Sequence, residues 1–104
     1  MATLKEVQTE ISRQIRRDYG DKDTDYKRVI CAIGLAEEAG EVAGLMKRVL
    51  RRQPKDLLRA TPEAFLDELG DVLWYLAACC DSQDISLEDV WQYNIKKLKE
   101  RYPE

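Results

Sequence analysis

Residues 61–81 decide the fold, and they read TPEAFLDELGDVLWYLAACCD. Thr61 is a favoured N-cap residue and Pro62 suits the first position of a helix, so this stretch predicts a helix that runs to about Asp81. Apolar residues occupy most faces of the predicted helix. A helix of that kind is central, and we expect it to pack within the protomer and also against another subunit.

Three other stretches show helical periodicity, at about residues 3–20, 25–52 and 86–102. Two of them open with the pattern of a capping box, Thr3 with Glu6 and Ser86 with Asp89. Pro54 marks the end of the second, and Gln53–Ala60 is the expected connector. No segment alternates with the period of a strand. The sequence therefore predicts an all-α fold, a single domain over residues 1–104 built as a four-helix-bundle-like protomer.

The composition is that of a globular chain, with 44% hydrophobic and 36% charged residues among 104. The 17 basic and 20 acidic residues give a net charge of -3, which argues against a nucleic-acid polymer as partner, because such binding relies on Lys and Arg. No apolar run approaches the roughly 18 residues of a membrane span, and the N-terminus lacks the apolar core of a signal peptide. We therefore expect no binding to nucleic-acid polymers or membranes.

Few side chains are available for chemistry. The chain has no His, which removes Ser-His-Asp and Cys-His catalysis and His-based metal sites. Its three cysteines have no metal-binding spacing, and we interpret them as reduced core residues of a cytoplasmic protein: Cys31, Cys79 and Cys80. Any catalysis therefore has to use carboxylates, cations or a metal ion.

Two pairs of carboxylates lie in the most apolar stretches of the chain. Glu38 and Glu41 are three residues apart on one predicted helix, and Glu68 and Asp71 are three apart on the next, so each pair shares a helix face. If the two helices pack antiparallel, the pairs can face one another. Each contact of like charges at 4 Å then costs about 4 kcal/mol at an effective dielectric constant near 20. Protonation, Lys or Arg, or a divalent cation has to neutralise such a cluster.

Oxygen donors alone suit Mg²⁺ or Mn²⁺ better than Zn²⁺, which favours a metal site. Gly40 and Gly70 lie inside the two acidic motifs, and because a helical Gly costs about 1 kcal/mol, we expect a helix, ligand or metal to approach closely there. Glu37 is interpreted as a further metal ligand, as a group that supports the ligands, or as a surface charge. The competing interpretation of the whole cluster is a solvated acidic face or a buried ion-pair network with Arg or Lys.

The last predicted helix carries a polar stripe. Asn94, Lys97 and Arg101 fall on one face, and their side chains are of types that bind phosphate. Cations near a helix C-terminus also complement the helix dipole, which is the alternative reading. Tyr75 lies one turn beyond Asp71, where its hydroxyl could contact a ligand or simply pack in the core.

These residues resemble a known family. Residues 37–41, EEAGE, followed by residues 68–76, ELGDVLWYL, resemble the E-E-x-x-E…E-x-x-D signature of MazG-like all-α nucleoside triphosphate pyrophosphohydrolases. Residues 94–103, NIKKLKERYP, resemble that family's N-x-x-K-x-x-x-R-Y-P ending, so that the resemblance spans about residues 34–103.

The resemblance implies hydrolysis of a (d)NTP to the (d)NMP and pyrophosphate with Mg²⁺ or Mn²⁺, in a dimer or a dimer of dimers with sites near the subunit interface. It implies metal ligation by Glu38, Glu41, Glu68 and Asp71, with help from Glu37. It also implies phosphate binding by Asn94, Lys97 and Arg101 and a substrate contact by Tyr75. We expect Glu38 or Glu41 to orient the attacking water.

A second hypothesis is a non-catalytic helical dimer that serves as an interaction module, with an ion-paired acidic cluster. A ferritin-like di-metal redox bundle is disfavoured, because that chemistry typically uses E-x-x-H motifs and the chain has no His.

Overall fold

The computed structural model describes residues 1–20, 22–52 and 59–103, and within these ranges it contains four helices and no strand. The all-α prediction is therefore confirmed. The helices are α1 (Leu4–Tyr19), α2 (Thr24–Arg52), α3 (Pro62–Ser82) and α4 (Leu87–Arg101). Of the predicted connector, residues 53–58 lie outside the described residues.

The predicted capping residues Thr3, Thr61 and Ser86 are the N-caps of α1, α3 and α4, but one of the two predicted capping boxes is absent. The side chain of Thr3 accepts from the backbone of Glu6 and the Glu6 side chain reaches back, which completes a capping box. Thr61 caps α3 in the simpler way, by accepting from a backbone N–H. Ser86 accepts from the backbone N–H of Asp89 at 2.9 Å, but no reciprocal bond joins this pair. The prediction of a second capping box was wrong, and we attribute this to Asp having a shorter side chain than the Glu or Gln of that motif.

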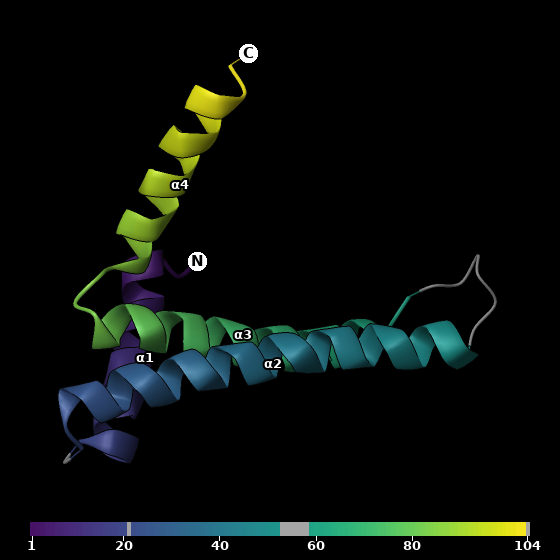
Figure 1. Cartoon of the computed structure of the whole chain (residues 1–104), viewed down its shortest axis with the longest axis horizontal. Coiled ribbons are helices and arrows are strands. Elements are labelled where there is room, and N and C mark those ends of the chain that lie inside the picture. Colours follow the sequence, from purple (N-terminus) through teal and green to yellow (C-terminus); the bar gives the residue numbers. More distant parts are fainter. Residues whose placement is uncertain (21, 53–58, 104) are drawn as a thin grey trace.

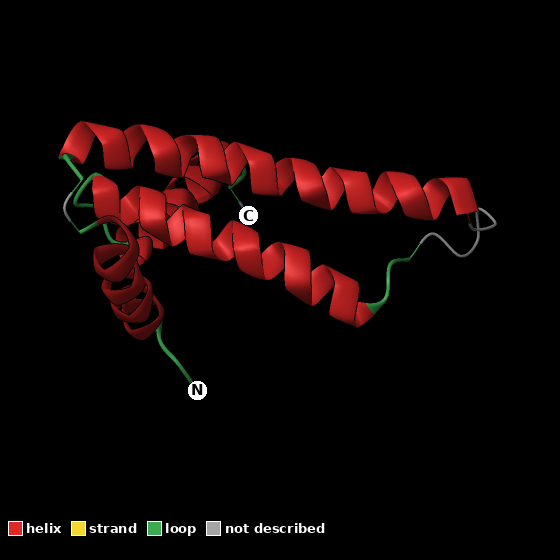
Figure 2. Cartoon of the chain, turned by 90° about the horizontal axis from the view of Figure 1, so that it is seen from below, coloured by secondary structure: helices red, strands yellow, loops and turns green. Residues whose placement is uncertain are grey.

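Helices α2 and α3 form an antiparallel pair that runs the length of the molecule (Figures 1 and 2). Helix α1 crosses one end of α3, and α4 packs mainly against α1 before it runs away from the pair (Figure 1). The radius of gyration is 16.5 Å, compared with about 13 Å for a compact domain of this length. The protomer is thus open.

The base of α4 is held by one side chain of α1. The amide of Gln8 donates to the carbonyl of Ile85 at 2.8 Å and accepts from the backbone N–H of Leu87 at 2.7 Å. Just before these residues, Asp84 adopts φ 56°, a left-handed conformation that Asp tolerates better than most residues. The direction in which α4 leaves the body is therefore set by contacts with α1.

The core is small and lies where α1 meets α2 and α3. Its buried apolar residues are Ile11, Ile15, Cys31, Ala77, Ala78, Cys80 and Leu87. Polar groups at its edge are paired, since Ser12 donates to Asp81 and the Trp74 indole donates to Gln14. The cysteines are free, and burial raises the pKa of all three thiols, in keeping with their predicted place in the core.

A large apolar surface stays exposed on the protomer. On α3, Leu66, Leu69 and Leu73 follow one another at helical spacing with 73%, 49% and 44% of their surface exposed. Trp91 and Tyr93 of α4 are also exposed. None of the described helices combines the length and the apolarity needed to cross a bilayer.

Candidate functional site

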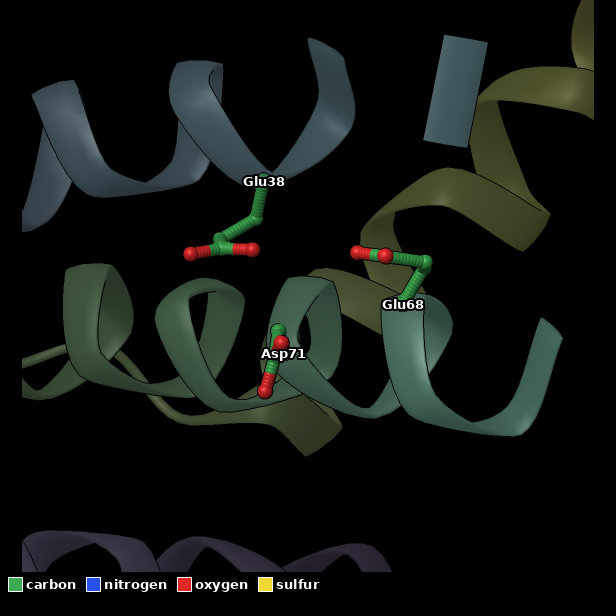
Figure 3. Close-up of side chains that lie close together, drawn as sticks. All are labelled: Glu38, Glu68 and Asp71. Atoms are coloured by element: carbon green, nitrogen blue, oxygen red, sulfur yellow. The ribbon is translucent and has the colours of Figure 1, made fainter. Parts of the chain in front are cut away.

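The α2–α3 pair brings three of the predicted carboxylates together. Glu38 points from α2 toward Glu68 and Asp71 of α3 (Figure 3). One carboxylate oxygen from each residue can be chosen so that all three lie within 4.8 Å of one another. The expectation that acidic residues of the two helices face each other therefore agrees with the geometry.

Glu41 and Glu37 lie at the edge of this cluster. Neither belongs to the group of three within 4.8 Å, and both are exposed. Glu41 is about one turn further along α2 than Glu38, and Glu37 is rotated from it by about 100°. Their charges nevertheless act on Glu38, so they belong to the same acidic surface.

The cluster carries unfavourable charge. Removal from solvent raises the pKa of Glu38 above its usual value, and the neighbouring carboxylates raise it further, that of Asp71 most strongly. The ion pairs found within residues 1–20, 22–52 and 59–103 lie elsewhere: Glu10 with Arg13, Asp18 with Arg17, and Asp25 with Arg28. In the described part of the protomer, therefore, no Lys or Arg neutralises the cluster through an ion pair.

These donors fit a hard divalent cation. Mg²⁺ binds oxygen at about 2.0–2.1 Å, so two ligands on opposite sides of the ion are about 4.2 Å apart. Adjacent ligands are closer, about 3 Å apart, so three oxygens that already lie within 4.8 Å of one another need to move only a short distance inward to share one ion. Glu38, Glu68 and Asp71 could hold the ion, with Glu41 close by on α2.

The predicted close approach at the motif glycines is not found within residues 1–20, 22–52 and 59–103. A Cβ built on Gly40 or on Gly70 meets nothing within 4 Å among the described residues, so no neighbouring helix explains these two glycines. The close approach occurs instead at Gly34, where a Cβ would lie 2.1 Å from Cε1 of Tyr75. The spacing of residues along α2 does not indicate this contact, because Tyr75 belongs to another helix.

Tyr75 lies beside the carboxylates, on the same face of α3 as Asp71. Its ring packs over Gly34 and stands edge-on to Trp74, with ring centroids 5.0 Å apart. Burial raises the pKa of its hydroxyl above the usual value, and the nearby Tyr19 and Glu38 raise this pKa further. The predicted substrate residue thus borders the cluster and is half-buried.

The protomer does not bring the polar stripe of α4 to its own carboxylates. Asn94 and Lys97 line an apolar pocket of about 570 Å³ together with Leu73 of α3, and Arg101 is exposed. Leu73 is two residues from Asp71, which places it about 160° around the helix. Asn94 and Lys97 therefore lie beside the face of α3 that points away from the cluster.

A family model for the MazG nucleotide pyrophosphohydrolase domain matches residues 30–104. This chain belongs to the MazG family. The part of the chain that matches the MazG domain contains the three-carboxylate cluster, Tyr75 and α4, and it begins after α1.

Relatives of this MazG domain occur in a phage and in a bacterium. The "Gene 37 protein" of Mycobacterium phage L5 is 35% identical over 82 residues, which are 79% of this chain and 72% of that protein. Two uncharacterized proteins of Bacillus subtilis (strain 168) are also similar. YpjD is 31% identical over a match that covers 95% of this chain and 86% of YpjD. YvdC is 34% identical over a match that covers 76% of this chain and 79% of YvdC. No solved structure matches the chain significantly.

Proposed function

We propose that this MazG domain is a metal-dependent nucleoside triphosphate pyrophosphohydrolase, which converts a (d)NTP to the (d)NMP and pyrophosphate in nucleotide clearance or pool adjustment. The observation that carries the proposal is the convergence of Glu38, Glu68 and Asp71 without an ion-pairing Lys or Arg in the described part of the chain. Membership of the MazG family supports the same class of reaction.

In this proposal Glu38, Glu68 and Asp71 bind Mg²⁺, or Mn²⁺ in its place, and Glu41 and Glu37 complete the acidic surface. The bound ion supplies charge neutralisation for phosphoryl transfer, a reaction that depends mainly on positioning and electrostatics. Glu38 or Glu41 orients the attacking water as a hydrogen-bond acceptor. Pyrophosphate then leaves as a product whose charge also has to be balanced.

Phosphate binding by Asn94, Lys97 and Arg101 requires a second copy of the chain. Asn94 and Lys97 lie beside the far face of α3 in their own chain, and Arg101 is exposed near the end of α4, so in the proposed homo-oligomer α4 of one copy approaches the carboxylates of the other. The exposed apolar residues of α3 and α4 support such an assembly, because large apolar patches are uncommon on isolated proteins. A dimer would contain two such sites, related by symmetry.

The experiment that tests this function is a nucleotide panel. Purified protein is incubated with each canonical and several modified dNTPs, with Mg²⁺, with Mn²⁺ and with a chelator, and both pyrophosphate and monophosphate are measured. We expect equal amounts of the two products from at least one nucleotide, and none with the chelator. Absence of turnover with every nucleotide and both metals would favour the non-catalytic interaction module.

A further inference from the structure

Gly34 and Tyr75 form a fitted pair at the edge of the carboxylate cluster. The ring of Tyr75 occupies the space that a side chain at position 34 would fill, since a built Cβ lies 2.1 Å from Cε1, 2.5 Å from Cδ1 and 2.6 Å from Cζ. Real Cβ contacts are never this short, so any residue other than Gly at position 34 has to displace the ring. Gly34 is buried and Tyr75 is half-buried at this contact.

Helix geometry places this pair directly beside the cluster. Gly34 and Glu38 are four residues apart on α2, and Asp71 and Tyr75 are four apart on α3, so each pair lies on one helix face. The contact between Gly34 and Tyr75 is thus one turn from the facing carboxylates of Glu38 and Asp71. Tyr75 closes the end of the cluster that is nearer to the core.

We infer that Gly34 is a positioning residue, which seats the Tyr75 ring against α2 so that the ring shields the Glu38 carboxylate from water and strengthens binding of a divalent cation. Shielding matters because the attraction between a carboxylate and a cation grows as the local dielectric constant falls. Apolar groups around a metal site control solvent access in the same way. The inference rests on the proposed function only for the location of the cation.

Among the glycines near the cluster, Gly34 is the one whose built Cβ meets another helix in the described part of the chain. At Gly40 and Gly70 a Cβ meets nothing within 4 Å in the described residues, and at Gly44 the nearest atom is a guanidinium nitrogen of Arg48 at 3.4 Å, an ordinary contact. A Gly→Ala change therefore disturbs packing at position 34 and not at position 44. Gly44→Ala is a matched control on the same helix.

The test measures binding of Mn²⁺ alone by calorimetry, without any nucleotide. We expect Gly34→Ala to weaken Mn²⁺ binding about tenfold, as is typical when a group that supports metal ligands is lost, and Gly44→Ala to leave it unchanged. Tyr75→Ala should weaken binding to a similar extent. In the Tyr75→Ala background, Gly34→Ala should have no further effect, because the ring that it displaces is gone.

Near-ultraviolet circular dichroism reports the ring itself, because Tyr75 contacts Trp74. Gly34→Ala and Tyr75→Ala should both change that spectrum while the far-ultraviolet helix signal stays the same. If Gly34→Ala does not fold, Tyr75→Ala alone decides the matter, and an unchanged Mn²⁺ affinity in that variant overturns the inference.

Equal Mn²⁺ affinity in Gly34→Ala and Gly44→Ala also overturns the inference. So does a result in which Gly34→Ala lowers the Mn²⁺ affinity by the same factor in the Tyr75→Ala background as in wild type. Wild-type protein that binds no Mn²⁺ overturns it as well. Wild-type protein that binds Mn²⁺ but hydrolyses no nucleotide contradicts the proposed function and leaves this inference standing.

Discussion

Glu38 of α2 faces Asp71 of α3, and Asp71 is the charged residue that raises the pKa of Glu38 most strongly. In the described part of the chain, neither carboxylate forms an ion pair with Lys or Arg. The two negative charges therefore repel each other, and a bound cation would relieve this repulsion. The same pair should therefore affect both the chemistry and the stability of the protein.

Replacing Asp71 by Asn should separate these two effects. A metal ion contributes several kcal/mol to a phosphoryl-transfer transition state, so loss of this ligand should lower kcat/KM by about a hundredfold or more. The metal-free variant should unfold at the same or a higher urea concentration than wild type, because one repelling charge is gone. Glu63→Gln, in the first turn of the same helix, is the control and should retain activity. Unchanged turnover in Asp71→Asn would refute the site.

The stability of the metal-free protein should depend on pH through Glu38. Its pKa is raised in the folded state, so its contribution to stability is present below the unfolded-state value and is lost as pH rises through the folded-state value. Urea unfolding in chelator across the mildly acidic range should show this decline. Glu38→Gln should flatten the decline, and an identical slope in that variant would argue against this origin.

Mg²⁺ should stabilise the protein by mass action. At a hundred times its Kd a ligand adds about 2.7 kcal/mol, which for a chain of this size corresponds to a rise in Tm of about 10 °C or more. Thermal unfolding with added MgCl₂ measures the shift, and NaCl at matched ionic strength is the control. Asp71→Asn should lose the shift, whereas a shift of the same size in that variant would place the ion elsewhere.

Complementation should reveal whether α4 serves the partner's site. Asp71→Asn and Arg101→Ala copies should each be weakly active, the second chiefly through a raised KM. After the two are unfolded together and refolded, half of the dimers are mixed and each has one intact site, so activity should reach about a quarter of wild type. Activity that stays at the average of the parent proteins would mean that each site is built from one copy.

The exposed leucines of α3 should hold the copies together. Leu69→Lys places a charge in the centre of the apolar row formed with Leu66 and Leu73, and it should shift sedimentation toward the monomer. Thr9→Lys on α1 is the control, since that residue is exposed outside the row. A wild-type chain that sediments as a monomer would contradict the assembly on which the complementation test relies.

The helices were predictable because their signals are local. Thr3 and Thr61 mark helix starts because their side chains accept a hydrogen bond from a free backbone N–H, and Pro62 marks one because it has no N–H that needs a partner. The structure places each helix end within a residue or two of the prediction. The i, i+3 spacing of the two acidic pairs allowed them to face one another if the helices packed antiparallel, and Glu38, Glu68 and Asp71 do so, whereas Glu41 lies outside the group of three.

Two features depend on contacts that a linear pattern does not contain. The close contact at Gly34 is made by Tyr75, a residue of another helix, so no spacing within α2 indicates it. The path of α4 arises from the turn at Asp84 and from Gln8, both outside the motif residues. Asn94, Lys97 and Arg101 share one face of α4, and their predicted role in phosphate binding stays a prediction, because the periodicity of a helix does not indicate what its face contacts.

Through the two hydrogen bonds of Gln8, α1 affects the direction of α4, although Gln8 is far in sequence from the acidic motifs. An amide can bind a carbonyl and an N–H at once, whereas a Glu in its place keeps only the acceptor, so one substitution can loosen the root of α4. Because α4 is 15 residues long and Arg101 is its last residue, a small rotation at its N-terminal end moves Arg101 by several ångströms. A substitution in α1, which precedes the MazG match, can therefore redirect α4 while every acidic residue stays in place.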